Sequence, residues 1–439
     1  MIELEGLTNI ARDAAGPQFE GRVERVSGML VEAAGVPAAI GELCRIDCGR
    51  SGPVDAEVVG FRDGATLLMP HGDTSGIAPR HRVRRLGRDF EIGVGDQLLS
   101  RTLDGLGRPI DEGPRLECTD RRRVRSDAPA PLARPLIDQA LSTGVRALDA
   151  CATLGRGQRI GVFAGSGVGK STLISDILSG SDSDVTVLAL VGERGREVRA
   201  FLDKALNGEQ RKRVVCVVAT SDRPPIERYL APFVAVTIAE HFRDAGKDVL
   251  LVMDSITRFA QAAREIGLAA GEPAALRGYP PSFFATVPKI VERMGRTEQG
   301  SITGLLTVLV DGDDPNEPVS DTLRGLLDGH VHLSRDLANA GHFPAIDVLA
   351  SLSRLMPDLV GPEHQALATQ LRRDLAVWRD GRDLVEVGAY RAGTNPELDA
   401  ALARRPLVEA FLRQEGPERL SMEETVALLA AVLGSQGEA

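Results

Sequence analysis

The stretch RIGVFAGSGVGKSTLISDIL, residues 159–178, determines how the rest of this chain is read. It begins with an apolar run typical of a buried strand, continues through a glycine-rich loop, and ends with the spacing of a helix. This order is the context in which a P-loop pattern binds phosphate. The strict pattern has glycine at position 164, where this chain has Ala164, the mildest replacement. We therefore predict a nucleotide site in this loop.

Each residue type in the loop has a physical reason to contact phosphate. Glycines let backbone N–H groups converge on phosphate oxygens, and the helix N-terminus adds the positive end of its dipole. Lys170 can reach the β- and γ-phosphates, and the Ser171 hydroxyl can ligate Mg²⁺. The predicted nucleotide-binding residues of the loop are Gly165, Ser166, Gly167, Val168, Gly169, Lys170, Ser171 and Thr172.

Two acidic residues follow other apolar runs. Asp254 ends the run 248–254, where P-loop enzymes place an aspartate that orients Mg²⁺, although an aspartate there can also cap the next helix. Glu193 follows the run 185–191, a position from which a carboxylate could orient the attacking water. It could equally complement the dipole of the following helix, as Glu197 could. The local pattern leaves both roles open for Glu193.

Arg354 ends the segment PAIDVLASLSR, residues 344–354. An arginine after two serines on a loop could be an arginine finger, whose guanidinium neutralises the charge that spreads over a transferring phosphoryl group. A surface arginine would have the same sequence context, so spacing leaves both readings open.

Composition bounds the class of protein. A chain of 439 residues is expected to hold two or three domains. The formal charge of −10 argues against a dedicated nucleic-acid binder. Basic clusters at 80–85 and 121–125 are typical of solvated faces, with a contact to acidic lipid or to a partner as the alternative. No apolar run approaches the length of a membrane span and the N-terminus has no signal pattern, so we expect a cytosolic location.

The pattern of apolar residues changes twice along the chain. Short apolar runs with turn signals between residues 21 and 88 predict a small β-barrel. From residue 133, strands alternate with helices, which is typical of a parallel sheet covered on both faces. Beyond residue 361 only helical spacing remains. The predicted class is α/β, with an N-terminal segment and barrel at 1–90, an ATPase domain at 91–361 and a helical domain at 362–439.

These motifs together resemble the catalytic subunits of rotary ATPases, a family that includes F-type ATP synthase β subunits and the hexameric ATPases of flagellar and injectisome type III secretion. The resemblance covers nearly the whole chain, and residues 344–353 match the family's α/β signature. It implies a RecA-like P-loop ATPase core, hydrolysis of ATP with Mg²⁺, and a homohexamer with ATP bound between subunits.

The resemblance assigns roles to single residues. Glu193 would polarise the attacking water, and Arg194 would be its basic companion. Asp254 and Glu197 would lie at the Mg²⁺ site together with Ser171.

Two further roles follow from the signature segment. Arg354 would act as an arginine finger across the subunit interface. Phe343 falls on the position that stacks on adenine, where the family usually has tyrosine; this chain keeps the ring face and loses the hydroxyl.

Glu193 also excludes the non-catalytic synthase subunit, which has glutamine at this position. The segment 271–282 is similar to the type III export ATPases as a group, and the loop GSGVGKS and the segment 388–397 resemble their flagellar branch. The alternatives are an injectisome ATPase, a catalytic synthase subunit, or an RNA translocase of the transcription-termination type. The translocase would need aromatic stacking platforms in a basic groove, which the barrel region lacks.

The flagellar resemblance implies a set of partners. They are a regulator on the segment Met1 to Phe19, a central stalk protein, the export gate and the exported proteins, with no nucleic acid. The implied location is cytoplasmic, peripheral to the inner membrane at the export apparatus.

Overall fold

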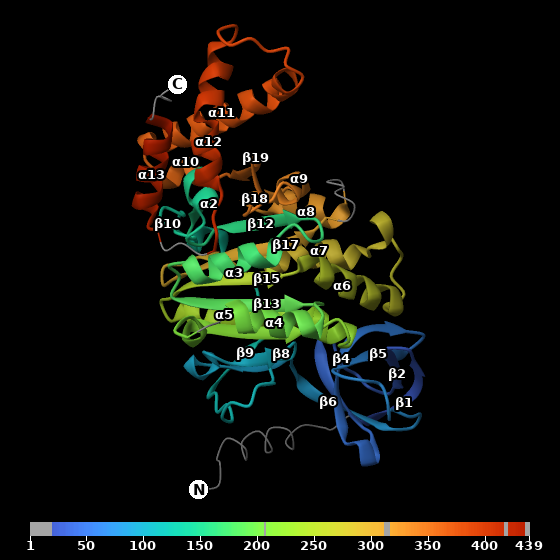
Figure 1. The fold of residues 1–439 in the computed structure, drawn as a ribbon. Coiled ribbons are helices and arrows are strands. Elements are labelled where there is room, and N and C mark those ends of the chain that lie inside the picture. The colour runs from blue at the N-terminus through green and yellow to red at the C-terminus, as the bar shows by residue number, and fades with distance from the viewer. Residues whose placement is uncertain (1–19, 206–207, 311–316, 417–419, 435–439) are drawn as a thin grey trace.

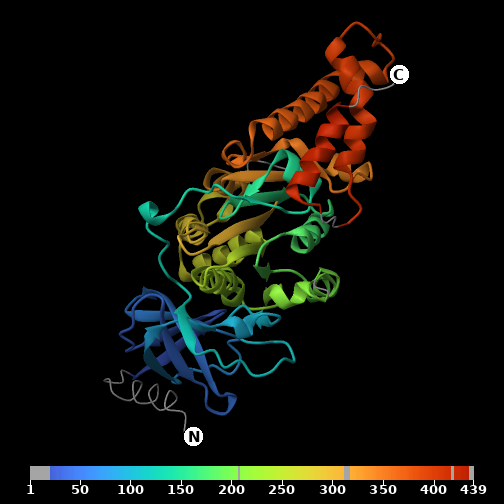
Figure 2. The same ribbon diagram turned by 90° about the vertical axis from the view of Figure 1, so that its left-hand side faces the viewer.

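The computed structural model describes residues 20–205, 208–310, 317–416 and 420–434. The segment 1–19, on which a regulator is expected, lies outside the described residues. A barrel and a group of helices lie at opposite ends of a central α/β layer, as the two views of the molecule show (Figures 1 and 2). The predicted α/β class, with a barrel before it and helices after it, is confirmed.

The N-terminal barrel closes in the strand order β1-β2-β5-β4-β3-β6. Alternate side chains point inward and fill it with apolar groups, among them Val23, Val31, Ile46 and Leu68. The strands are β1 Glu20–Ser27, β2 Leu30–Ala34, β3 Glu42–Asp47, β4 Pro53–Arg62, β5 Ala65–Pro70 and β6 Arg82–Asp89.

The central sheet has the order β19-β18-β12-β17-β15-β13-β14-β8, with β16 paired to β17. Neighbours are parallel except for β19 on β18 and β16 on β17. The strands are β8 Thr102–Asp104, β12 Arg159–Ala164, β13 Val185–Val191, β14 Val214–Ala219, β15 Asp248–Asp254, β16 Gly295–Arg296, β17 Ser301–Leu309, β18 Gly329–Leu333 and β19 Ile346–Ser353.

This topology decides where side chains can meet. The carboxyl ends of the parallel strands lie along one edge of the sheet, and loops from different parts of the chain converge there. Strand β19 runs the other way, so the residue after it lies at the opposite edge. The inner strands are almost wholly apolar because helices cover both faces.

One face of the sheet packs against α5, α6, α7 and α8, and the other against α2, α3, α4 and the C-terminal helices. The helices are α2 Arg146–Cys151, α3 Lys170–Gly180, α4 Gly195–Ala205, α5 Pro225–Asp244, α6 Ile256–Ala270, α7 Pro281–Val291, α8 Pro318–Leu326, α9 Arg335–Asn339, α10 Met356–Leu359, α11 Pro362–Glu386, α12 Pro396–Leu412 and α13 Met422–Gly434. The remaining short elements are β7 Glu91–Val94, β9 Asp120–Arg123, β10 Ala140–Leu141, β11 Leu154–Gly155, η1 Gly49–Ser51, η2 Asp96–Leu98, η3 Pro131–Ala133, η4 Gln210–Arg213 and η5 Leu276–Gly278.

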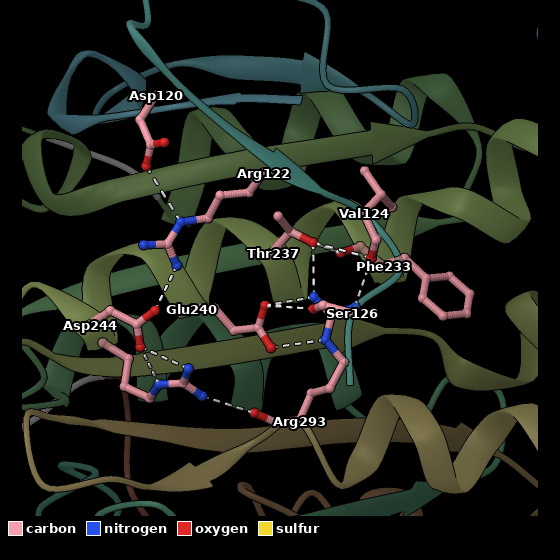
Figure 3. Close-up of polar contacts among 10 residues, drawn as sticks. Asp120, Arg122, Val124, Ser126, Phe233, Thr237, Glu240, Asp244 and Arg293 are labelled. Atoms are coloured by element: carbon pink, nitrogen blue, oxygen red, sulfur yellow. Dashed lines mark hydrogen bonds and ion pairs between the residues drawn. The ribbon is translucent and has the colours of Figure 1, made fainter. Parts of the chain in front are cut away.

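A buried ion pair holds the segment that leads out of β9 against the central domain (Figure 3). Arg293 is 1% exposed and donates to both carboxylate oxygens of Glu240, at 2.9 and 2.6 Å. Its Nη1 also donates to the Val124 carbonyl at 2.8 Å, and Nη2 to the Thr237 hydroxyl at 2.9 Å. The link between barrel and sheet is therefore fixed on α5.

The basic cluster around β9 is paired with acids. Arg122 lies 2.6 Å from Asp244, and the neighbouring Arg123 lies 3.4 Å from Asp89. These pairs agree with a solvated face, while the contact to acidic lipid stays a prediction. In the part of the chain that the structure describes, none of the helices is both long enough and apolar enough to cross a bilayer.

Candidate active site

The predicted phosphate loop lies between β12 and α3, at the carboxyl edge of the sheet (Figure 1). Gly167 and Gly169 have φ values of +79° and +93°, a region that side-chain-bearing residues rarely adopt. Helix α3 starts at Lys170, and no described side chain caps its first turn at Gly169. Its first N–H groups therefore keep their capacity to bind an anion.

Lys170 lies between two carboxylates. Its ammonium is ion-paired with Asp254, and Glu193 Oε1 lies 3.7 Å away. The side chains of Lys170 and Asp254 are 11% and 5% exposed. Three residues that are 23 or more positions apart in sequence thus meet because β12, β13 and β15 end at the same edge.

Asp254 has a partner that sequence reasoning missed. The Thr307 hydroxyl, on the adjacent strand β17, donates to Asp254 Oδ1 at 2.7 Å and is fully buried. A single hydroxyl in the otherwise apolar run 304–310 was the available signal. Thr307 holds the carboxylate that faces Lys170.

Glu193 follows β13 at the turn made by Gly192, whose φ is +71°. Burial, as the largest cause, raises the pKa of Glu193 above its ordinary value of 4.5; Asp254 and Glu197 also raise it, while Lys170 and Arg258 oppose the shift. A side chain on Gly192 would collide with Arg258, so the turn and this arginine pack directly together. A raised pKa suits a group that accepts a proton.

A cavity of about 440 Å³ opens beside this cluster. It is lined by Ser171, Thr172, Ser175, Leu190, Glu193, Glu197, Val198, Ala200, Phe201 and Asp254. A second cavity, of about 650 Å³, lies at the far end of α3 against α13 and includes none of the predicted site residues. The smaller cavity is therefore the candidate site.

Phe343 lies against the phosphate loop. Its ring would be 3.3 Å from a Cβ placed on Gly169, and the residue is 43% exposed. Gln414, a residue that sequence reasoning missed, donates its backbone N–H to the Phe343 carbonyl at 2.9 Å and its side-chain amide to Gly144 at 2.7 Å. The segment after α12 thus supports the loop that carries Phe343.

Two other predicted residues lie at the rim. The Arg194 side chain is 80% exposed and its Nη1 lies 3.6 Å from Glu197. Glu197 lines the cavity and is 48% exposed. Neither is held against Lys170 in the way that Asp254 is.

Arg354 is not part of this cluster. It follows β19, and its N–H donates to the carbonyl of Asp328. The Asp328 carboxylate accepts the N–H of Arg159, the first residue of β12. Strand β12 spans roughly 16 Å at about 3.3 Å per residue, so the two edges of the sheet are at least that far apart. Arg354 and Lys170 lie at opposite edges of one chain.

The residues present fit Mg²⁺ and a nucleotide. Mg²⁺ prefers oxygen ligands and usually keeps several waters, binding through one or two carboxylates plus substrate phosphates. Ser171 and Asp254 offer such oxygens beside the loop. Among the described residues, no group of three or more His, Cys, Asp or Glu is placed to hold a metal by itself.

Comparison with known proteins finds three matching regions. Residues 144–353 match the ATP synthase alpha/beta family, nucleotide-binding domain; residues 23–87 match the beta-barrel domain of that family. Residues 360–431 match the T3SS EscN ATPase C-terminal domain.

Full-length relatives are similar throughout. The chain is 46% identical to the flagellum-specific ATP synthase of Bacillus subtilis over 95% of both chains. It is 49% identical to the SPI-2 type 3 secretion system ATPase of Salmonella typhimurium, over 91% of this chain and 93% of that protein.

Solved structures are similar to this chain over most of its length. The assembled ATPase EscN of the enteropathogenic E. coli type III secretion system superposes with a TM-score of 0.90 at 43% identity, covering 94% of this chain and all of that one. EscN in complex with its central stalk EscO gives a TM-score of 0.87 at 42% identity, with the same coverage.

Proposed function

The chain belongs to the ATP synthase alpha/beta family, within its flagellar and type III secretion branch, and we propose that it hydrolyses ATP as a ring of six copies to energise flagellar protein export. The observation that carries this proposal is the cluster of Lys170, Asp254 and Glu193 beside an uncapped helix, with Arg354 at the opposite edge of the same sheet.

The loop would bind the phosphates of ATP. Backbone N–H groups at the start of α3 and the ammonium of Lys170 supply positive charge, and Lys170 exchanges its bond to Asp254 for one to phosphate. The Ser171 hydroxyl would ligate Mg²⁺, and Asp254 would orient the waters of the ion. When bound, Mg²⁺ would neutralise charge on the β- and γ-phosphates. Phe343, exposed beside Gly169, offers a ring face to the adenine.

Glu193 would orient the attacking water. It lies beside Lys170, and its raised pKa favours acceptance of a proton at the moment of attack. The products of this step are ADP and phosphate. Arg194 and Glu197, at the rim, would complete the site without contacting Lys170.

Arg354 would serve the site of a neighbouring copy. Its distance from Lys170 within one chain supports this role, because a finger must contact the transferring phosphoryl group. A ring of like subunits, each with a site at one edge and a finger at the other, gives every site one finger. Activity is then expected only in the assembled form.

Export by the flagellum is the proposed use of this activity. The central stalk partner is supported by the EscN–EscO complex, and the flagellar relative supports the flagellar branch. We also propose a location at the cytoplasmic face of the export gate, with the exported proteins as further partners and a regulator on residues 1–19. We further propose that the barrel domain ends at residue 90, the ATPase domain spans residues 91–361, and the helical domain begins at residue 362.

Mixed rings test the shared site. Glu193→Gln and Arg354→Ala chains, carrying different tags, are co-expressed and isolated through both tags. Each variant alone should retain only a small residual turnover, whereas mixed rings regain hydrolysis because the Glu193→Gln copy supplies Arg354 to a neighbour with an intact Glu193. Mixed rings as inactive as the separate variants would refute action across the interface.

Deletion in the native organism tests the biological role. Loss of the gene should abolish flagellar filaments, and the wild-type chain, but not Glu193→Gln, should restore them. Intact filaments together with loss of secreted effectors would assign the chain to an injectisome. Stimulation of hydrolysis by single-stranded RNA would instead point to a translocase.

A further inference from the structure

The side chain of Gln158 is fully buried at the turn that leads into β12. Its Nε2 donates to the Ser353 hydroxyl at 2.9 Å and to the Asp328 carbonyl at 3.3 Å. Its Oε1 accepts the N–H of Gly155 at 2.8 Å. One amide therefore joins the start of β12 to the start of β18 and the end of β19.

Both acceptors of this amide hold the backbone of Arg354. Ser353 is the residue before it, and the Asp328 carbonyl also accepts the Arg354 N–H at 2.9 Å. The Asp328 carboxylate is itself held by Arg159, whose Nε and Nη2 donate to it at 3.0 and 3.1 Å. The backbone around Arg354 is thus fixed from two sides.

The guanidinium of Arg354 is held far less. It is exposed, and its hydrogen bond to the Arg324 carbonyl is 3.4 Å long. The direction in which this side chain leaves the surface therefore depends on the position of its backbone. The backbone before Arg354 is also held by close packing of β19 on β18, because a Cβ on Gly329 would lie 2.4 Å from the Leu352 carbonyl.

We propose that Gln158 is a positioning residue, which holds Arg354 in the direction it needs to reach the nucleotide site of the neighbouring copy. This inference rests on the proposed function of Arg354. Gln158 lies at the amino end of β12, and the phosphate loop follows its carboxyl end. One strand thus joins the nucleotide site of a subunit to the support of the finger that the same subunit offers its neighbour.

The alternative is that Gln158 only closes the turn before β12 through Gly155. If Gln158 had only that role, its loss would destabilise the fold and would impair the subunit's own nucleotide site as much as the finger it offers its neighbour. The two roles differ in which site of the ring is damaged, and that difference can be measured.

Steady-state kinetics of assembled rings give the first test. Gln158→Leu removes both donated hydrogen bonds, and Ser353→Ala removes one acceptor while leaving the Gly155 contact intact. We expect kcat to fall by about 10- to 100-fold in Gln158→Leu and by roughly 3- to 10-fold in Ser353→Ala, because a misplacement of about 1 Å costs up to about 100-fold, with KM for ATP changed by less than about twofold.

Ser301→Ala is the matched control. Ser301 is a buried serine at the same edge of the sheet, whose hydroxyl donates to Asp248 at 2.7 Å and does not contact Arg354. Its kcat should stay within about twofold of wild type. An equal loss in Ser353→Ala and Ser301→Ala would overturn the positioning role. If Gln158→Leu fails to fold, Ser353→Ala carries the test.

Mixed rings give the second test, with the tag design used above. Gln158→Leu keeps an intact Glu193, so co-assembly with Glu193→Gln should bring hydrolysis per intact site back to at least half that of wild type, because the Glu193→Gln neighbour supplies a well-placed Arg354. Ser353→Ala should be rescued in the same way. Rings that show no rescue would overturn the inference.

The two proposals can fail separately. If Arg354→Ala is rescued by Glu193→Gln but Gln158→Leu and Ser353→Ala are not, the finger stands and the positioning role falls. If Arg354→Ala is not rescued either, the trans finger itself is wrong. Finally, Gln158→Leu added to Arg354→Ala should lower kcat by less than about twofold further; the full 10-fold loss on that background would show a general structural role.

Discussion

The ammonium of Lys170 is ion-paired with the carboxylate of Asp254, across the edge where α3 begins and β15 ends. Both side chains are nearly buried, and Thr307 holds Asp254 from the adjacent strand. The same two groups are the ones proposed to bind phosphate and Mg²⁺. Binding of Mg-nucleotide would therefore replace one ion pair with two charge-matched contacts.

Asp254→Asn is predicted to weaken the binding of Mg²⁺ more than the binding of the nucleotide. The amide keeps the contact to Thr307 and loses the charge that orients the metal's waters. The Mg²⁺ concentration for half-maximal hydrolysis should rise by about 10- to 100-fold, as for other groups that hold a metal indirectly. A Mg²⁺ titration at saturating ATP measures this. An unchanged Mg²⁺ requirement would remove Asp254 from the metal site.

Glu193→Gln is predicted to lower kcat by about 10²- to 10⁴-fold, the range for loss of a general base. In the wild type the ionised form is active and the pKa of Glu193 is raised, so the acid limb of kcat/KM should lie above pH 4.5. A pH–rate profile checks the position of this limb. A limb at the ordinary glutamate value, or substantial activity in the variant, would assign the base elsewhere.

The same substitution should stabilise the protein at neutral pH. A carboxyl whose folded pKa is raised favours folding below its unfolded pKa, here the ordinary value of 4.5, and loses that contribution as the pH rises through the folded value. Glu193→Gln carries no such cost, so its Tm should exceed that of wild type at pH 7 and approach it near pH 4. The exposed neighbour Glu197→Gln serves as the control, and a gain that is independent of pH would contradict this account.

Phe343→Ala should weaken nucleotide binding. Stacking of a base on an aromatic ring contributes about 1–3 kcal/mol, so Kd for ATP should rise by roughly 5- to 100-fold. Phe343→Tyr keeps the ring face and should bind within about threefold of wild type. Titration with a fluorescent ATP analogue measures both variants. Equal affinity in Phe343→Ala and wild type would place the adenine elsewhere.

Glu240→Ala should destabilise the chain without touching the nucleotide site. It leaves Arg293, 1% exposed, without its carboxylate, and breaking a buried pair in this way costs about 3–5 kcal/mol. Urea denaturation measures the loss. The double variant Glu240→Leu with Arg293→Met removes both charges and should recover most of it; equal losses in the single and double variants would show that packing, and not charge, is responsible.

Much of this protein follows from local sequence. The strand, loop and helix at 159–178 predicted the phosphate loop because glycine conformations and apolar spacing are local properties, and the structure has Gly167 and Gly169 at positive φ there. Strands at 185–191 and 248–254 coincide with β13 and β15 because continuous apolar runs have few other stable arrangements in a covered sheet.

Tertiary structure alone decided how these parts meet. Thr307 faces Asp254 only because β17 lies beside β15, and strand order is a property of the whole sheet. Gln414 supports Phe343 from a segment 71 residues further on, a contact with no local signal. The direction of β19 sends Arg354 to the edge opposite Lys170. Sequence thus predicted which residues carry chemistry, while strand order and direction, set by packing between distant segments, decided that Arg354 and Lys170 lie at opposite edges of one chain.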